Sequence, residues 1–464
     1  MPRCTGRWDS GWPPRAMSAR SSKPFGLWTA AALVVGHTIA VGIFLTPAEL
    51  IGALASPALT FSVWIFCGAL VLAGAFTFGE LASRYPRAGG PYVYLREAWG
   101  ERSAFLYGWQ CLLVMDPGVT AALALGASQY LVLLWPDAAG AERWMAVGAI
   151  WLLAFAAMSG LTLSARVLGM LTAFKLLALA AVVIIAFTMG EGDWSRVMPS
   201  SAARSGSPPL AEALAIGLMG AFFSFGGFWE ASRVAGEVRD PRRTMPAALA
   251  LGVSCVTIVY LATTAAFMYL VPASEIGSAS DFANRAGQAM LGPAGPAALA
   301  AIVVLSVMTS ILALLIMAPR LCLAMGRDGL FPAPLASVDG VTRAPVRATA
   351  MLALLASLFA LVGTFQQVVA LFICPALAFI ALAASALLAL RRRNVRADAF
   401  RAPGYPLTTW LFVLLVTAVV IMIAVNRPLE ALTGFGLVLL GLPAHALLRL
   451  RRRRMPAVAT GVDP

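Results

Sequence analysis

The sequence predicts an all-α integral membrane protein with twelve transmembrane helices. Apolar residues make up 60% of the chain and charged residues only 12%, whereas an ordinary soluble protein has about 25% charged residues. Apolar windows of about 20 residues, the length that crosses a hydrocarbon core, recur along the whole chain. Short loops join these spans and leave no room for a soluble catalytic domain, so the membrane bundle must carry the function.

The expected spans follow one another between two tails. Their limits are 25–52, 57–82, 103–135, 142–163, 167–190, 211–236, 247–271, 296–324, 347–364, 367–390, 407–425 and 430–449. Residues 1–24 have basic residues but no apolar region that ends in a cleavage site, so we expect a disordered cytoplasmic tail and not a signal peptide. Met17 is as suitable a translation start as Met1. Residues 453–464 are expected to form a cytoplasmic C-terminal tail.

The distribution of arginine predicts that both termini are cytoplasmic. Cytoplasmic loops accumulate Lys and Arg, and an even number of spans places both termini on one side. That side holds the arginines of both tails and of the loops after each even-numbered span, whereas the other side has only Arg143, Arg196, Arg204, Arg285 and Arg427. The net charge of +13 therefore reflects mostly the signal that keeps these loops in the cytoplasm, together with attraction to anionic inner-leaflet lipid. We expect a multi-pass protein of the plasma or inner membrane. The net charge does not indicate a nucleic-acid partner, because the basic residues are scattered over short loops.

We expect no metal, no cofactor and no enzyme site. The six cysteines include no CxxC pair, His37 and His445 are the only histidines, and no HExxH motif occurs. An intramembrane enzyme would need metal ligands or a nucleophile–base pair. A channel or receptor would not need the two interrupted helices described next.

Two apolar spans contain glycine where a membrane helix should be continuous. The first span reads "VVGHTIAVGIF" over residues 34–44, and the sixth reads "FFSFGGFWE" over 222–230. Glycine lowers helix stability by roughly 1 kcal/mol, and freed backbone groups are tolerated only where they face protein or a watery cavity. Glycine-interrupted segments at matching positions of two halves indicate the midplane site of a transporter. The alternative is that these glycines only allow close helix packing.

Several longer motifs resemble one family. The segments are "GHTIAVGIF", "GELASRYPRAGGPYVYLREAWG", "FSFGGFWEASRVAGEVRDPRRTMPAAL", "PRLCLAMGRDGLFP" and "GFGLVLLGLPAHALL". They are similar to the amino acid–polyamine–organocation (APC) superfamily, most closely to its L-type amino-acid transporter branch and bacterial relatives. The resemblance implies one transporter domain, 25–452, with a LeuT-like fold: an inverted five-plus-five repeat, 25–190 and 211–390, followed by two further helices within 407–449.

The resemblance also implies where an amino acid would bind. Burying an unpaired carboxylate or ammonium is costly, whereas the ends of a broken helix offer amides to the one and carbonyls to the other. The expected carboxylate donors are the amides of Val41, Gly42 and Ile43, and the expected ammonium acceptors are the carbonyls of Thr38, Phe223 and Gly226. The ring of Phe223 matches the family's gating aromatic, although plain packing would also explain it. Ala40 and Val41 depart from the family pattern, which removes a hydroxyl and leaves the backbone donors.

Lys175 lies in the middle of the fifth span, where an isolated charge costs about 3 kcal/mol or more. In related sodium-independent transporters a lysine at this position replaces a bound sodium ion between the first and eighth spans. We therefore expect its ammonium to contact first-span carbonyls between Gly36 and Ile39. Snorkelling to the interface is the alternative. We take the eighth-span stretch at the same place to be 316–319, which has no hydroxyl.

Other charges lie within the predicted spans. Glu230, Arg233 and Glu237 would share one face of an α-helix and either pair structurally or take part in gating. Asp116 and Arg320 stay unassigned, with a mutual ion pair as one option. His37 is either a satisfied hydrogen-bond partner or a proton-coupling group.

The sequence thus predicts a secondary active amino-acid transporter. We expect Na⁺-independent exchange of neutral amino acids by alternating access, with no obligatory protein partner beyond the bilayer and the small-molecule substrate. Two alternatives stay open: proton-coupled symport, and transport of cationic amino acids or polyamines. A cation carrier would need a carboxylate in the side-chain pocket, for which Glu230 is the only nearby candidate. The identity of the substrate stays open.

Overall fold

The apolar runs of the sequence form helices over most of the chain. The computed structural model describes residues 25–40, 42–190, 192–197, 208–272, 279–332, 334–393, 399–426 and 428–454. Regular structure within these residues is helical, apart from one isolated β-bridge between Phe25 and Val238. The expected tail 1–24, residues 455–464 of the expected tail 453–464, and Val41 lie outside the described residues, whereas residues 453 and 454 are helical.

Eight helical stretches of the described chain are long and apolar enough to cross a membrane. They are Pro57–Arg84, Glu101–Leu134, Thr162–Thr188, Pro241–Leu270, Asn284–Arg327, Gln367–Arg392, Leu407–Val425 and Pro428–Leu448. Shorter apolar helices cover Leu27–Thr38, Leu210–Phe222 and Val346–Val362. A multi-pass membrane protein follows from these lengths, because about 20 apolar residues span the hydrocarbon core.

The individual helices have the following bounds. They are α1 Leu27–Thr38, α2 Gly42–Leu54, α3 Pro57–Arg84, α4 Pro91–Trp99, α5 Glu101–Gln110, α6 Asp116–Leu134, α7 Glu142–Met158, α8 Leu161–Thr188, α9 Leu210–Ser224, α10 Pro241–Leu270, α11 Ala279–Leu291, α12 Gly295–Met317, α13 Pro319–Arg327, α14 Val346–Val362, α15 Phe365–Arg392, α16 Leu407–Asn426, α17 Pro428–Leu439 and α18 Gly441–Arg454. A π-helical turn, η1 Cys111–Met115, joins α5 to α6, and a 3₁₀-helix, η4 Phe228–Glu237, follows α9.

Both expected helix breaks are present. Helix α1 ends at Thr38 and α2 begins at Gly42. Helix α9 ends at Ser224, and Gly227 then adopts a φ of 95° before η4 begins. That left-handed conformation favours glycine, since a Cβ there strains the backbone. The glycines singled out in the sequence therefore lie where the helices stop.

Two span boundaries differ from the sequence expectation. Helix α8 starts at Leu161 and not near residue 167, because Gly160, with a φ of 141°, makes the turn after α7. The last expected span, 430–449, is divided at Leu440 into α17 and α18, and α18 continues to Arg454.

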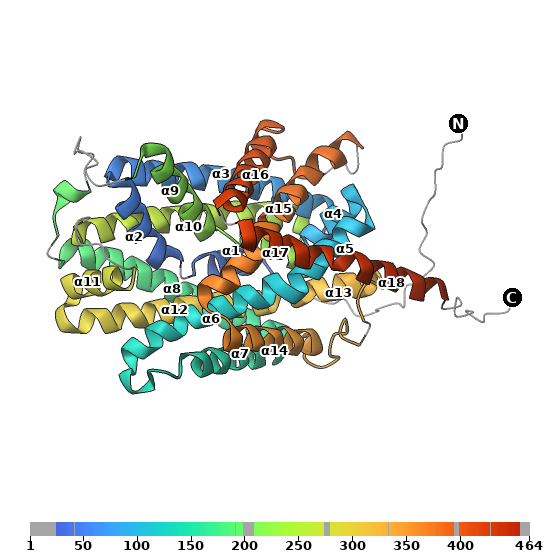
Figure 1. Cartoon of the computed structure of the whole chain (residues 1–464), viewed down its shortest axis with the longest axis horizontal. Coiled ribbons are helices and arrows are strands. Elements are labelled where there is room, and N and C mark those ends of the chain that lie inside the picture. Colours follow the sequence, from blue (N-terminus) through green and yellow to red (C-terminus); the bar gives the residue numbers. More distant parts are fainter. Residues whose placement is uncertain are drawn as a thin grey trace.

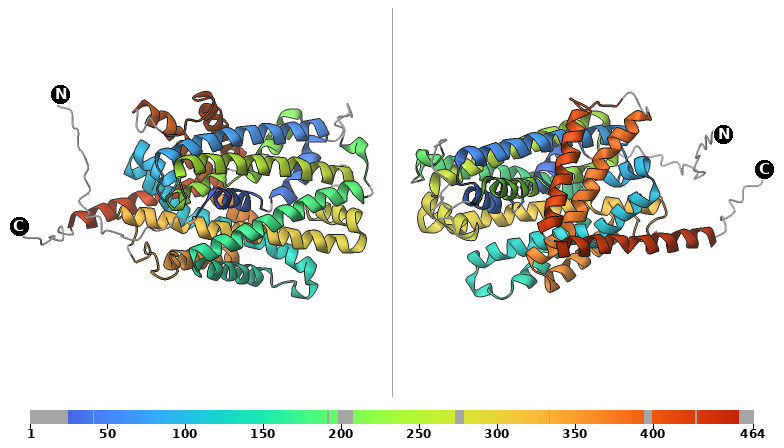
Figure 2. Two further views of the ribbon diagram at one scale, coloured as in Figure 1. Left: turned by 180° about the vertical axis from the view of Figure 1, so that it is seen from behind. Right: turned by 45° about the horizontal axis from the view of Figure 1, so that its top comes forward.

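The helices lie side by side as one elongated bundle with two different ends. Helices α4, α13 and α18 lie at one end, and α2, α9 and α11 lie toward the other (Figure 1). We call the end that holds α4, α13 and α18 the arginine-rich end, because it carries Arg84, Arg87, Arg96, Arg320 and Arg391. Helix α1 lies inside the bundle between α8 and α10 (Figure 2, left). The broken helices thus face protein, as their free backbone groups require.

Candidate functional site

The two helix breaks meet inside the bundle. Gly42 opens α2 directly against the end of α9: a Cβ on Gly42 would lie 2.7 Å from Ser224 Oγ. One turn further along α2, the Thr46 hydroxyl lies 2.6 Å from the Ser224 hydroxyl. Glycine at position 42 is therefore required for the close approach of the two interrupted helices.

Tyr260 of α10 bridges the ends of α1 and α9. Its hydroxyl lies 3.0 Å from the Thr38 carbonyl oxygen and 2.7 Å from the Ser224 carbonyl oxygen. Both carbonyls are released by the helix ends, so a hydroxyl from a continuous neighbour partly satisfies them. The rings of Trp64 and Phe225 pack edge-on or tilted around the Tyr260 ring, with centroids 5.0 and 5.1 Å away.

The resulting arrangement offers both kinds of backbone group to one region. The first-turn amides of α2, which include Gly42 and Ile43, have no acceptor within their own helix and carry partial positive charge. The carbonyl of Thr38 and the turn containing Gly226 lie at the facing ends. Val41 and the ring of Phe223 lie outside the described part of the structure. Amides and carbonyls together suit a ligand that carries a carboxylate and an ammonium.

Lys175 is buried and reaches across from α8 to the first break. Its Nζ donates to the Gly36 carbonyl at 3.0 Å and to the Ile39 carbonyl, and it lies 3.4 Å from Ser310 Oγ. These acceptors fall in the 36–39 stretch to which the sequence analysis assigned the contact. The ammonium therefore does not reach an interface, and the snorkelling alternative is wrong.

The eighth-span prediction is wrong in register. The α12 residues beside Lys175 are Ser306 and Ser310, not the stretch 316–319. Ser310 Oγ lies 2.8 Å from the Gly36 carbonyl oxygen and 3.0 Å from that of Ile39, and Ser306 Oγ donates to Ile39 at 3.2 Å. Hydroxyls are thus present at this place, about two to three turns before the stretch that the sequence pattern favoured.

His37 connects α1 to both α12 and the second break. Its Nδ1 lies 3.3 Å from the Ser310 carbonyl oxygen, and since a carbonyl only accepts, Nδ1 carries the proton. The ring edge lies against Gly227, where an added Cβ would be 2.4 Å from His37 Cδ2. His37 therefore has a hydrogen-bond partner and fills the space that Gly227 leaves.

Arg233 of η4 is the centre of a buried charge cluster. It pairs with Glu230 one 3₁₀ turn earlier and with Asp116 of α6 at 2.7 Å, and it donates to the Tyr107 hydroxyl at 3.1 Å. All of these side chains are buried. Buried charges require such pairing, because each one alone costs several kcal/mol.

Glu237 does not join this cluster, which corrects the expectation of one shared face. In an α-helix, position i+7 returns to the face of i, but η4 is a 3₁₀-helix with three residues per turn. Glu230 and Arg233 are then in line, while Glu237 is rotated away. It pairs with Arg320 at 3.3 Å. The Asp116–Arg320 pair that the sequence left open is wrong, since each residue has a different partner.

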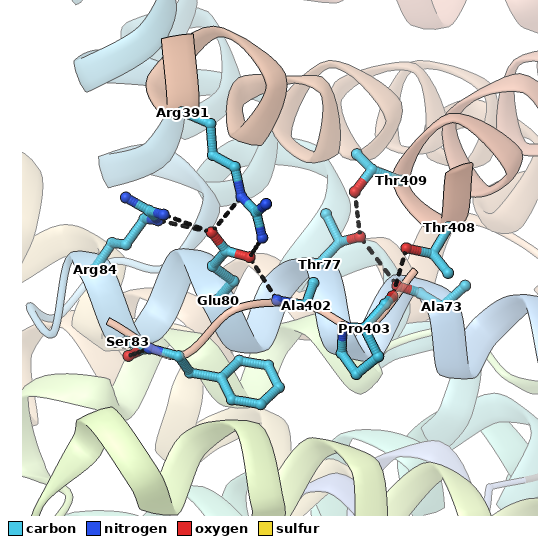
Figure 3. Close-up of polar contacts among 11 residues, drawn as sticks. Ala73, Thr77, Glu80, Ser83, Arg84, Arg391, Ala402, Pro403, Thr408 and Thr409 are labelled. Carbon is cyan, nitrogen blue, oxygen red and sulfur yellow. Dashed lines mark hydrogen bonds and ion pairs between the residues drawn. The ribbon is translucent and has the colours of Figure 1, made fainter. Parts of the chain in front are cut away.

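A second charge cluster, which the sequence analysis missed, lies around Glu80 of α3 (Figure 3). The buried Glu80 carboxylate accepts hydrogen bonds from Arg84 at 2.8 Å, from Arg391 of α15 at 2.7 Å and from the Ala402 amide at 2.6 Å. The Arg391 guanidinium also lies 3.7 Å from the centroid of the Tyr405 ring. Glu80 thus joins α3 to the end of α15 and to the segment before α16.

The missed residues had weak sequence signals. A single tyrosine hydroxyl in an apolar helix, such as Tyr260, is an ordinary feature of a membrane span. Ser306 and Ser310 are four residues apart and so share one helical face, but serine is common where membrane helices pack closely. Only the fold shows that these hydroxyls point at the free carbonyls of α1. Among the described residues, no group of three or more His, Cys, Asp or Glu side chains could hold a metal ion.

Comparisons with known proteins identify the family of the chain. A family model described as "Amino acid permease" matches residues 25–440. Asc-type amino acid transporter 1 of Mus musculus is 27% identical over 68% of this chain and 60% of its own length. Large neutral amino acids transporter small subunit 2 of Homo sapiens is 28% identical over 70% and 62%. The b(0,+)-type amino acid transporter 1 of Mus musculus is 25% identical over 86% and 82%. The match thus spans about three fifths of the first two relatives.

Proposed function

This chain belongs to the amino acid permease family, whose members are transporters and not enzymes, and on that premise we propose that it exchanges neutral amino acids across a membrane without Na⁺. The observation that carries the proposal is the meeting of two broken helices beside a buried lysine ammonium.

The proposed fold has twelve spans. To the eight long apolar stretches of the described chain we add α1 with α2, α9 with η4, α7, and α14. The two broken spans then open two repeats, 25–190 and 211–390, which the fold relates by inversion, and two further helices lie within 407–449 of a transporter domain covering 25–452. Support comes from the equal placement of the breaks, each at the start of one half.

The proposed substrate site lies between the breaks. The substrate carboxylate binds the amides of Val41, Gly42 and Ile43, and its ammonium binds the carbonyls of Thr38, Phe223 and Gly226. The Phe223 ring closes over it. Support comes from the first turn of α2, where amides without helical acceptors begin at Gly42, and from its contact with the end of α9.

The proposed cation is the side chain of Lys175. Its ammonium occupies the place among Gly36, Ile39 and Ser310 oxygens where a bound Na⁺ would otherwise sit. Because this positive charge belongs to the protein, no Na⁺ binds there, and a sodium gradient supplies no free energy for transport. Net movement then depends on counter-transport of a second amino acid, and proton coupling through Lys175 or His37 is the alternative.

Neutral substrates fit the charges better than cationic ones. Glu230 is the carboxylate that a cationic side chain would need, yet its charge is paired with Arg233, and one of its oxygens accepts from Trp229 Nε1 at 2.8 Å. One of the relatives is named for large neutral amino acids. We therefore assign the Glu230–Arg233 pair to structure or gating.

The proposed location is the plasma or inner membrane, with the arginine-rich end in the cytoplasm. We also propose that the chain transports without an obligatory partner chain. Since one relative is named as a small subunit, the test of this point is transport by the purified chain alone.

The experiment is uptake of labelled amino acids into proteoliposomes that contain only this protein. A scan of the twenty amino acids identifies the substrate. External Na⁺, an imposed pH gradient and internal unlabelled amino acid are then varied one at a time. Stimulation by internal substrate alone supports exchange, stimulation by the pH gradient alone supports the symport alternative, and strict dependence on external Na⁺ contradicts the role given to Lys175.

A further inference from the structure

A groove opens between α1, α8 and α10 on the outside of the bundle. Its volume is about 960 Å³, and its walls include the small residues Ala32, Gly169, Ala173 and Gly252. Figure 2 (left) shows α1 lying between the other two helices. None of these residues belongs to the proposed substrate site.

The groove exists because α1 is held by its second half. A Cβ on Gly36 would be 2.8 Å from Thr172 Oγ1, so α1 and α8 are in contact there, and Lys175 joins them one turn further along. Toward its first turn, α1 faces small side chains of α8, and Gly169 has no atom within 4 Å of an added Cβ. Space is left between the helices on that side.

The mouth of the groove is basic and lies near the start of α8, a helix long enough to span a membrane. Arg166 and Arg239 both line it, and both are exposed. Within the described residues, Arg166 forms no ion pair. Trp28, 79% exposed, and Met170, 70% exposed, lie beside them and form an apolar edge. Tryptophan is enriched at the interface between headgroups and acyl chains, so an exposed Trp28 beside two arginines suits that position.

We propose that this groove binds one anionic phospholipid, with its phosphate between Arg166 and Arg239 and an acyl chain along the apolar walls. Guanidinium groups bind phosphate oxygens in a planar, two-bond geometry, and the small residues of the walls leave room for a hydrocarbon chain. The headgroup then joins α8 to the segment between η4 and α10, and the acyl chain fills the space beside α1. The inference requires only that the bundle spans a membrane and not the proposed transport mode.

A second groove contains arginines but suits an anionic headgroup less well. It lies between α3 and α10, has a volume of about 810 Å³ and contains Arg242 and Arg243, but Asp240 is also part of its lining. A phosphate there would meet a carboxylate. Among the described residues, the lining of the α1–α8–α10 groove includes no acidic residue, so its charge matches an anionic headgroup without that repulsion.

The first test measures lipid retention by native mass spectrometry. The purified protein is exchanged from mixed micelles containing equal amounts of phosphatidylglycerol and phosphatidylcholine. The wild type is expected to retain phosphatidylglycerol preferentially. Since one basic residue near an anionic lipid contributes roughly fivefold, the Arg166→Ala/Arg239→Ala variant should lose about 30-fold in affinity. Arg102→Ala, an exposed arginine that lines neither groove, is the control and should behave as wild type.

The second test fills the groove without disturbing the fold. Gly169→Leu places a side chain where no atom lies within 4 Å, and Gly148→Leu does the same in α7, away from the groove. Gly169→Leu should abolish retention while the melting temperature in detergent stays at or above that of the Gly148→Leu control, since leucine favours helix over glycine.

Three results would overturn the proposal. The first is equal retention of the two lipids by the wild type, and the second is unchanged retention in both groove variants. The third is inorganic phosphate raising the melting temperature as much as phosphatidylglycerol does, which would identify a phosphate site without a lipid chain. Amino-acid uptake is not needed for any of these readouts, so a failed transport proposal leaves the lipid test intact.

Discussion

At the scale of single residues, replacing Lys175 is the most direct test of how transport is coupled to a cation. Its ammonium is fully buried and donates to carbonyls freed by the end of α1. Lys175→Ala is expected to slow transport roughly ten- to hundredfold, as about 1.5–3 kcal/mol is lost with hydrogen bonds from a charged donor. Substrate binding, measured by calorimetry, should persist because the α2 amides are untouched.

Two controls sharpen this prediction. Phe174→Ala changes the adjacent exposed side chain of α8 and should leave the rate unaltered. In Lys175→Ala, the oxygens of Gly36, Ile39, Ser306 and Ser310 remain, so external Na⁺ is expected to restore part of the rate. Transport by Lys175→Ala at the wild-type rate would show that the lysine has no role in coupling.

Tyr260 provides a second prediction at this scale. Tyr260→Phe leaves the carbonyls of Thr38 and Ser224 without their shared donor, and an unsatisfied buried acceptor costs about 1–3 kcal/mol. The melting temperature and the transport rate should both fall. Tyr130→Phe is the matched control, because that buried hydroxyl has no hydrogen-bond partner among the described residues. Equal effects of the two variants would contradict the bridging role.

At the scale of elements, the Glu80 cluster joins α3 to the end of α15. Glu80→Gln keeps the shape of the side chain but removes the carboxylate charge that pairs with Arg84 and Arg391. Breaking a buried pair in this way costs about 3–5 kcal/mol, so the melting temperature should drop markedly. Glu97→Gln removes the partly exposed pair with Arg87 and should cost under about 1 kcal/mol. A Glu80→Gln protein as stable as Glu97→Gln would rule out a structural role.

The same scale shows what the sequence could predict. Apolar length predicts the long helices, and glycine pairs predict both breaks, because these signals are local. The 3₁₀ geometry of η4 has no such local signal in the sequence, and it accompanies contacts of Arg233 with Asp116 and Tyr107 on the third span. Assuming an α-helix therefore misplaced Glu237. The register error at Ser306 and Ser310 has the same origin, since only packing decides which turn of α12 lies beside α1.

At the scale of the whole molecule, three charged links connect helices that are distant in sequence. Lys175 joins α8 to α1, Arg233 joins η4 to α6, and Glu80 joins α3 to α15. Two of them involve a broken span, so movement of α1 or η4 against the rest of the bundle must lengthen or break a charged contact. In the proposed alternating access, these charged contacts are then among those that must change.

The distribution of arginine predicts how the bundle is oriented in the membrane. The arginine-rich end is expected to face the cytoplasm, and two exposed loop positions at opposite ends test it. In a Cys4→Ser background, Ala139→Cys lies between α6 and α7, and Val338→Cys lies between α13 and α14. The cysteines of the described helices are buried or partly buried, so they should react little. A membrane-impermeant maleimide should label Ala139→Cys on intact cells and Val338→Cys only after permeabilisation. The reverse labelling pattern would mean that the distribution of arginine does not determine the topology of this chain.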